Sequence, residues 1–245
     1  SLVQANNTSK KNNMASNTNT LAIEHIDSWT TNILKEEMKA TDEELIYFDK
    51  LQQLRYQKWE HFPDVDGENP SVVIDDFLYH GDIGHASNVS LLIKLGIHHI
   101  VNTCDESLKT EITHNFNVLW ISIDDDLRAN INQYFQQTND FLFSCKQKKE
   151  KVLVHCQMGI SRSSSIVLAY LMKYHHDTLI KAYKYLLDRR PQSLPNSGFL
   201  LQLIRYEKVL RNSGAIDEQR NDDDKQNPIK PIQIPSNFSV EKPLL

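Results

Sequence analysis

The chain has 245 residues, of which 40% are hydrophobic and 24% charged, and its formal net charge is −5 at pH 7. This length and composition favour one good-sized core with extensions over two full domains. The acidic balance leaves no global basic field, so we expect neither nucleic acid nor a membrane surface as a partner, and any anion site must be local. The longest apolar run, 166–172, is far shorter than the roughly 20 residues needed to cross a bilayer.

The cysteines predict the compartment. There are three, Cys104, Cys145 and Cys156. Three cannot all pair within one chain, and the number is low for a disulfide-stabilised scaffold. We therefore expect a reducing compartment, the cytoplasm or the nucleus. We recognise no signal-peptide pattern, and no CxxC or HExxH spacing predicts a metal site.

The first 70 residues are predicted to lie outside the main domain. Residues 1–40 are expected to be disordered, because the asparagine-rich first half cannot bury enough surface to offset the entropy of ordering. Residues 41–70 are predicted to be a helical extension and a linker. Thr41 and Glu44 fit a capping box at the start of a helix over 41–62. The apolar residues that share one face of this helix are Leu45, Phe48, Leu51 and Trp59. That face packs on the following domain, the interpretation we favour, or binds a partner.

Residues 71–212 alternate between strand-like and helix-like stretches. The strand-like stretches are 72–74, 77–79, 97–102, 118–123 and 151–155. The helix-like stretches are 86–95, 131–147, 161–175, 178–189 and 197–211. This alternation predicts an α/β fold with a central, mostly parallel twisted sheet flanked by helices on both faces. Residues 213–245 hold four of the eight prolines and an Asp run, and we predict a disordered acidic tail.

The sequence "VLVHCQMGISRSSS", residues 152–165, places a tight turn between an apolar strand and an apolar helix. The first amides of a helix lack internal partners and the helix dipole is positive there, so such a turn is a ready anion site. Gly159 allows a positive φ or a close approach to the ligand. Arg162 offers a planar fork for two phosphate oxygens. The same field favours the nucleophilic thiolate form of Cys156. This combination predicts covalent phosphoryl transfer through a thiophosphate.

Other kinds of site fit this turn less well. No lysine follows Gly159, so the turn is not a nucleotide-binding loop of the Walker type. A zinc site needs more Cys or His ligands than His155 and Cys156. The remaining alternative is a buried structural cysteine with an arginine that caps the sheet.

The segment from His155 to Ser163, "HCQMGISRS", resembles the signature of cysteine-dependent protein tyrosine phosphatases, and in detail their dual-specificity branch. The resemblance covers about residues 71–211. "FLYHGDIGHASNVSLLIKLGIHHIVN" (77–102) is similar to the branch's opening strand, helix and second strand, although the family more often has Leu-Gly at His80-Gly81. "RRPQSLPNSGFLLQL" (189–203) is similar to its closing segment. The signature and the ending "GFLLQLIRYEKVL" look most like the slingshot type, which acts on phosphorylated cofilin.

The resemblance implies a role for each residue of the signature. Cys156 is the nucleophile, and Arg162 clamps the phosphate. Ser163 hydrogen-bonds the thiolate as the leaving group of the second step. His155 orients the loop and helps to activate the thiol, which is compatible with its being a packed core histidine. The other phosphate-binding residues are Gln157, Met158, Gly159, Ile160 and Ser161.

The proton donor is expected in "WISIDDDLRANINQYF" (120–135), where three consecutive carboxylates follow a buried strand. The family places its acid about 31 positions before the cysteine, which gives Asp125, and the family's apolar residue six positions later is then Ile131. Asp125 is therefore the first choice, Asp126 the second and Asp124 the third. The alternative is that the run is a solvated acidic cap or caps the following helix.

Two further residues are expected near the site. Asn196 matches the family's asparagine that hydrogen-bonds the phosphate loop, and it also fits a helix N-cap. Cys104 follows the strand 97–102, so it lies at the carboxyl edge of a parallel sheet. There it either forms a disulfide with oxidised Cys156, as a cysteine in this region does in some relatives, or is an inert packed cysteine, which is the simpler expectation. Cys145 is interpreted as packing.

The variable positions of the loop are uncharged, which argues against an inositol headgroup and for a phosphoprotein substrate. We therefore predict a dual-specificity protein phosphatase that acts in signalling on phosphotyrosine and/or phosphoserine and phosphothreonine, without a cofactor or a metal. The alternatives are a catalytically silent phosphoprotein-binding module and a lipid, glucan or RNA-end phosphatase, although the acidic balance weighs against RNA.

Overall fold

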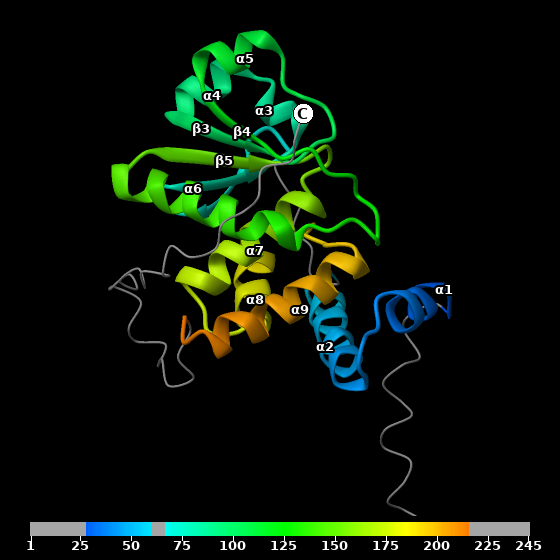
Figure 1. Cartoon of the computed structure of the whole chain (residues 1–245). Helices are drawn as coiled ribbons and strands as arrows, with labels where there is room; N and C mark the ends of the chain where they lie inside the picture. The colour runs from blue at the N-terminus through cyan, green and yellow to red at the C-terminus, as the bar shows by residue number, and fades with distance from the viewer. Residues whose placement is uncertain (1–27, 60–66, 216–245) are drawn as a thin grey trace, which may run out of the picture.

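A five-stranded sheet forms the centre of the computed structural model, which describes residues 28–59 and 67–215 (Figure 1). The strands are β1 (Ser71–Ile74), β2 (Leu78–Gly81), β3 (Ile97–Asn102), β4 (Asn117–Trp120) and β5 (Lys151–His155). Their order is β1-β2-β5-β3-β4; β1 pairs antiparallel with β2, and all other neighbours are parallel. The prediction of a mostly parallel sheet is confirmed.

The parallel strands β2, β5 and β3 end at the same edge of the sheet. Gly81 of β2 and Asn102 of β3 both pair with His155 of β5. The apolar residues 152–154 of β5 are fully buried, as is typical of a central parallel strand covered on both faces. The three segments that leave these strands therefore emerge side by side, with Cys156 on the middle one.

Short helices cover one face of the sheet (Figure 1). They are α3 (Ile83–Ala86), α4 (Val89–Leu95) and α5 (Thr110–Asn115). Their apolar side chains join those of the strands in a small core that includes Tyr79, Leu92, Ile100, Ile112 and Leu153. The helix predicted over 86–95 begins only at Val89, because the Asn88 side chain accepts from the amide of Leu91 and caps its start; the short helix α3 before it was not predicted. The helix α5 was not predicted from the sequence.

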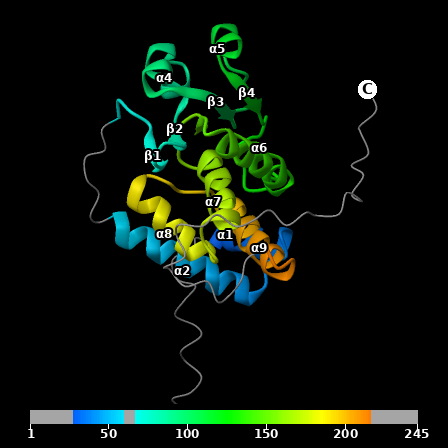
Figure 2. The same cartoon turned by 90° about the vertical axis from the view of Figure 1, so that its left-hand side faces the viewer.

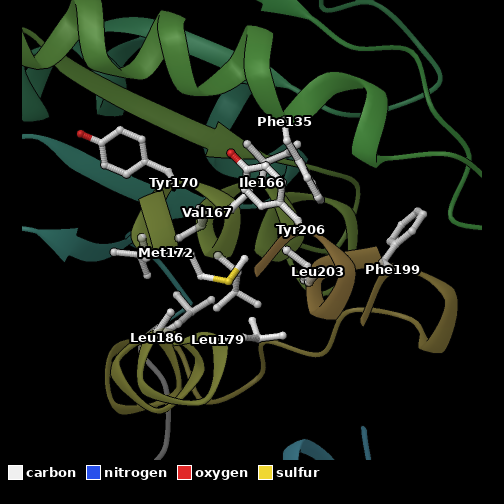
Figure 3. Packing of buried hydrophobic residues seen from close by; sticks show 14 of the residues in the cluster. Phe135, Ile166, Val167, Tyr170, Met172, Leu179, Leu186, Phe199, Leu203 and Tyr206 are labelled. Atoms are coloured by element: carbon white, nitrogen blue, oxygen red, sulfur yellow. The ribbon is translucent and has the colours of Figure 1, made fainter. Parts of the chain in front are cut away.

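Four longer helices cover the other face: α6 (Phe135–Lys148), α7 (Arg162–Tyr174), α8 (Leu179–Arg189) and α9 (Ser197–Asn212). Residues 162–172 of α7 are all buried, and α7 contacts each of the other three helices. Figure 3 shows this packing, in which the rings of Phe135 and Tyr206 lie 4.9 Å apart between α6 and α9. A helix enclosed in this way holds its first turn, and the loop before it, in a fixed position.

The helix α2 (Asp42–Trp59) packs on the domain, as the favoured interpretation of residues 41–62 predicted. Figure 2 shows it beside α8. Its buried apolar residues are Leu45, Phe48 and Leu51. The capping box is formed as well: the Thr41 amide donates to the Glu44 carboxylate (3.0 Å) and the Glu44 amide to the Thr41 hydroxyl (3.2 Å). The apolar face of α2 is therefore used within the chain.

The prediction of disorder over residues 1–40 is wrong for residues 28–40. These form α1 (Ser28–Asn32) and a π-helical turn, η1 (Ile33–Glu37). Leu34 is fully buried in the main core, and Arg205 of α9 donates to the carbonyl of Met38 (2.9 Å). The reason is compositional: the asparagine-rich stretch ends before this segment, and the segment's apolar residues find a partner surface on α9.

Other boundaries differ by a few residues. The strand predicted over 118–123 ends at Trp120, and the helix predicted from 131 begins as a 3-10 turn, η2 (Asn132–Tyr134). Residues 1–27, 60–66 and 216–245 lie outside the described residues, so the disorder expected at the two ends of the chain and the first half of the linker (63–66) stay predictions. Within the two described ranges, no helix is long and apolar enough to cross a membrane.

Leu34→Ala is expected to lower the free energy of unfolding by about 2–5 kcal/mol, because it removes a fully buried side chain and leaves a cavity. The matched control is Glu36→Ala, at an exposed position of the same turn, which should change stability by less than about 0.5 kcal/mol. Urea denaturation of the three proteins makes the comparison. Equal stability of Leu34→Ala and wild type would show that this segment does not pack on the domain.

Candidate active site

The loop from Cys156 to Ser161 joins β5 to α7, and its carbonyl groups are held from outside. Three distant groups donate to them: Ile83 N–H to Gln157 (3.3 Å), Arg190 Nε to Gly159 (2.8 Å) and Leu194 N–H to Ile160 (2.8 Å). Within the described ranges, the amides of residues 157–161 donate to no protein acceptor. Unpaired amides in a loop that opens a helix form an anion-binding nest.

Gly159 is the residue that allows this shape. Its φ is +64°, in the left-handed region that favours glycine. A Cβ at this position would also collide with the carbonyl of Gly81 and the guanidinium of Arg190. The loop therefore lies directly on the end of β2, with no room for a side chain between them.

Arg190, which follows α8, supports the loop from below and was not among the expected site residues. It is almost fully buried, and besides Gly159 it donates to the carbonyl of His80 and to the Ser71 hydroxyl (both 3.2 Å). Burial lowers its pKa to about 10, so the guanidinium remains charged at neutral pH. It adds a fixed positive charge beneath the anion site.

The thiol of Cys156 is 1% exposed. The Ser163 hydroxyl donates to its sulfur (3.1 Å), the contact that the resemblance implied. Ser163 also contacts Nε2 of His80 (2.8 Å), a residue that the sequence analysis noted only as a departure from the family. A hydroxyl that donates to sulfur favours the thiolate over the thiol.

Arg162 is anchored by one end of its guanidinium. Nη1 donates to the carbonyl of Ile123 (3.1 Å) and to the carboxylate of Asp105 (3.4 Å). Nε is buried without a hydrogen-bond partner among the described residues, and it lies 3.8 Å from Oδ2 of Asp125. The anchored end fixes the plane of the group, and Nε remains available to a phosphate oxygen. Asp105 was not predicted as part of the site.

The three consecutive carboxylates have different contacts. Oδ1 of Asp125 accepts from the Ser161 hydroxyl (2.6 Å) and from Nδ2 of Asn196 (2.8 Å). Asp126 instead accepts from the Arg128 amide (2.7 Å) and shapes its own turn. Asp124 is exposed and makes no hydrogen bond within the described parts of the chain. The structure therefore brings Asp125 to the phosphate loop and leaves the other two outside it.

Asn196 caps α9, as expected, and it also contacts the loop after β5 through its backbone. Its side-chain oxygen caps α9 by accepting from the Phe199 amide (2.9 Å), and its backbone amide donates to the Ser161 hydroxyl of the phosphate loop (3.0 Å). The loop that holds Asp125 lies close to α9: a Cβ at Gly198 would collide with the Leu127 carbonyl. Asn196 thus connects the loop after β5, the loop that holds Asp125, and α9.

His155 is fully buried, and burial lowers its pKa to about 4. The imidazole is therefore neutral at pH 7 and adds no positive charge next to Cys156. Its Nδ1 lies 3.4 Å from the Cys156 carbonyl oxygen, and its own carbonyl accepts from the amide and the hydroxyl of Thr103 (3.0 and 2.8 Å). These contacts fit the expected role of orienting the loop.

Cys104 and Cys145 are both free and buried. Cys104 is held by its backbone: its amide donates to the Asn102 side chain (2.9 Å), and its carbonyl accepts from Nε1 of Trp120 (3.0 Å). Burial raises the pKa of the Cys104 thiol to about 11, and the nearby Cys156 contributes in the same direction. Cys145 lies in the main core, where packing was expected.

Comparison with known proteins identifies relatives that share this fold and site. The family model "Dual specificity phosphatase, catalytic domain" matches residues 78–209. Human Dual specificity protein phosphatase 5 is 40% identical over 139 residues, which cover 57% of this chain and 36% of that protein. A Slingshot homologue from Xenopus laevis is 36% identical over 143 residues, 58% of this chain and 20% of that protein. The chain thus spans about a third or less of the length of these relatives.

A solved structure of a related protein has a similar fold. The human tyrosine phosphatase-like serine/threonine/tyrosine-interacting protein matches with a TM-score of 0.55 and 32% identity, over 58% of this chain and 98% of that chain. The fold and the loop are those of the cysteine-dependent protein tyrosine phosphatases. Within that class, the chain belongs to the dual-specificity phosphatase family. Identity to the Slingshot homologue is no higher than to the other relative, so it does not single out the slingshot type.

Acid is expected to destabilise the fold through its buried histidines. The unfolded chain binds a proton at His155 near pH 6.5, whereas the folded chain does so only near pH 4. Stability from this group is complete above pH 6.5 and is lost as the pH falls, by roughly 2 kcal/mol between pH 7.5 and 5. His80 acts in the same direction, because burial also lowers its pKa.

Urea unfolding at pH 7.5, 6 and 5 measures this dependence. His155→Gln is expected to flatten it, while the control His114→Gln, at an exposed position, should leave it unchanged. A wild-type stability that does not vary over this range would mean that the two histidines are not buried in their neutral form.

Proposed function

We propose that the protein is a phosphatase that hydrolyses phosphotyrosine and/or phosphoserine and phosphothreonine on proteins through a cysteinyl-phosphate intermediate. The observation that carries this proposal is the combination at Cys156. Its sulfur accepts a hydrogen bond from Ser163, and it opens a loop whose amides have no acceptor within the described ranges. A dianionic phosphate would bind those amides and Nε of Arg162 directly above a nucleophile.

In the first step the Cys156 thiolate attacks phosphorus, and the bond from phosphorus to the substrate oxygen breaks. Asp125 gives its proton to that oxygen, so the substrate leaves as a neutral alcohol or phenol. Arg162 and the loop amides stabilise the charge on the transferred phosphoryl group. Asp125 is the acid in this proposal because, of the three candidates, its carboxylate contacts the phosphate loop.

In the second step a water molecule attacks the phosphorus of the thiophosphate, and the sulfur leaves as a thiolate. Asp125, now deprotonated, accepts the proton from the water. The Ser163 hydroxyl, which lies 3.1 Å from the sulfur, stabilises the departing thiolate. Inorganic phosphate is released, and both Cys156 and Asp125 return to their starting forms.

A phosphoprotein is the proposed substrate class. The loop carries no charged side chain between Cys156 and Arg162, and Met158 is 66% exposed at its rim. An apolar rim suits a peptide better than a multiply phosphorylated headgroup. The free cysteines support a reducing compartment, so we place this dephosphorylation in cytoplasmic or nuclear signalling.

A silent phosphoprotein-binding module is the alternative, since one solved relative is named phosphatase-like and interacting. Phosphate release by wild type, Cys156→Ser and Asp125→Asn separates the two. The substrates are phosphotyrosine and phosphothreonine peptides, a phosphoinositide and p-nitrophenyl phosphate, with chelator present. We expect turnover of peptides by wild type and none by Cys156→Ser.

Asp125→Asn is expected to slow peptide hydrolysis by about 10²–10⁴-fold. Its effect on p-nitrophenyl phosphate should be smaller, because nitrophenolate leaves without a proton. The matched controls Asp124→Asn and Asp126→Asn should stay within about threefold of wild type. A wild type that binds phosphopeptide without releasing phosphate would overturn the proposal, and preferred hydrolysis of the phosphoinositide would replace its substrate class.

We further propose that Cys104 protects oxidised Cys156, although slowly. Peroxide converts the Cys156 thiolate to a sulfenic acid and is reduced to hydroxide; the Cys104 thiolate then displaces hydroxide from that sulfur and forms the disulfide. Because the pKa of Cys104 is about 11, its thiolate fraction rises about tenfold per pH unit in the neutral range.

The linked Cys104–Cys156 peptide should therefore be more abundant at pH 9 than at pH 7 after a brief peroxide exposure. Mass spectrometry detects the peptide, and Cys104→Ser is the control in which it must be absent. If the wild type gave no linked peptide at either pH, Cys104 would be an inert packed cysteine.

A further inference from the structure

His80 forms a contact that the proposed reaction does not yet use. It lies on β2, its side chain is fully buried, and Nε2 is 2.8 Å from the Ser163 hydroxyl. That hydroxyl is in turn 3.1 Å from the sulfur of Cys156. His80, Ser163 and Cys156 therefore form a continuous chain of hydrogen bonds from the central sheet to the nucleophile.

The direction of this chain follows from counting hydrogen atoms. The Ser163 hydroxyl has one proton, which it can donate to His80 or to Cys156. Nδ1 of His80 has no hydrogen-bond partner among the described residues. If the ring proton were on Nδ1, an N–H donor would be buried without an acceptor, which is rarer and more costly than an unused lone pair. The proton is therefore on Nε2, which donates to the Ser163 oxygen, and the Ser163 proton is left for the sulfur.

The surroundings of His80 keep it in this neutral form. Burial, together with the charge of Arg190 and the neighbouring imidazoles of His155 and His85, lowers its pKa well below the usual value. Each of these groups comes from a different element: the segment after α8, the end of β5, and α3. The direction of the hydrogen bonds therefore does not change over the working range of pH.

We propose that His80 is a positioning residue that turns the Ser163 hydroxyl toward Cys156 and so stabilises the thiolate. The inference rests on the proposed function, since it assigns a role in that same site. Without His80, the hydroxyl could rotate to other acceptors, as Ser164 and Ser165 do when they donate to the carbonyls of Ile160 and Ser161. Donation from His80 also polarises the hydroxyl and strengthens its bond to sulfur.

The test compares His80→Leu, which removes the donor, with His80→Gln, which keeps a donor. Ser163→Ala and the double variant His80→Leu/Ser163→Ala complete a double-mutant cycle for His80 and Ser163. Tyr79→Phe is the control, since Tyr79 lies on the same strand but in the small core on the other face. The readout is the rate of Cys156 alkylation by iodoacetamide as a function of pH, which follows the thiolate fraction.

We expect His80→Leu to raise the pH midpoint of alkylation by about half to one unit, with Ser163→Ala raising it at least as much. The double variant should match Ser163→Ala alone, because His80 acts only through Ser163. His80→Gln should recover part of the shift, and Tyr79→Phe should show none. In turnover of p-nitrophenyl phosphate, His80→Leu should lower kcat by about three- to tenfold and leave KM nearly unchanged.

An unchanged midpoint in His80→Leu, or a shift that persists in the Ser163→Ala background, would overturn the inference. If His80→Leu does not fold, His80→Met, which also removes the donor, gives the same decision when it is compared with and without Ser163→Ala. Alkylation does not need turnover, so its outcome is separate from that of the proposed function: a protein without phosphatase activity could still show the midpoint shift.

Discussion

The rest of the site depends on one constraint: carbonyl groups of the phosphate loop, residues 156–161, point outward and accept hydrogen bonds from other segments of the domain. A loop of five successive unpaired amides is unfavourable on its own, because each amide would otherwise find an acceptor. Here Ile83, Arg190 and Leu194 hold the carbonyls from three different segments, and the enclosed helix α7 fixes the far end of the loop. The amides are thereby kept available for one anion, next to Cys156. The packed domain thus holds these amides in advance in the arrangement that stabilises a phosphoryl group during its transfer.

The loop that carries Asp125, the proposed acid, is connected to the phosphate loop, to α9 and to the N-terminal segment. Asp125 contacts Ser161 and Asn196, and Leu127 lies against Gly198 in the first turn of α9. Three residues after Asp125, Arg128 pairs with Glu37 of the N-terminal segment through two hydrogen bonds of 2.6 and 2.9 Å. Both side chains of this pair are about half exposed, so it adds little stability. Its significance is geometric, because it connects residues 28–40 to the loop that carries the proposed proton donor.

Features that are set by neighbouring residues in the chain could be predicted from the sequence, whereas features that depend on contacts with distant residues could not. The strand, turn and helix around Cys156 are predictable because two apolar runs enclose a turn whose residue types bind phosphate. Asp125 cannot be separated from its neighbours by chemistry alone, since its direction is set by Asn196, which lies 71 residues away. Arg190 and His80 look like ordinary residues in the sequence, and their contacts with the loop exist only in the fold. The segment from residue 28 to residue 40 was missed because it is held by distant contacts, the burial of Leu34 in the main core and the hydrogen bond from Arg205 to the Met38 carbonyl, rather than by propensity.

The central claim is that a phosphoryl group passes through the sulfur of Cys156. The most direct measurement is rapid acid quenching of wild-type enzyme during turnover of a phosphotyrosine peptide, followed by mass spectrometry of the modified residue. The account predicts a phosphoryl group on Cys156 within the first turnover, and a higher occupancy in Ser163→Ala, because the sulfur is then a poorer leaving group. Turnover with a phosphoryl group on any other residue, or with none on the protein under conditions in which breakdown limits the rate, would contradict it.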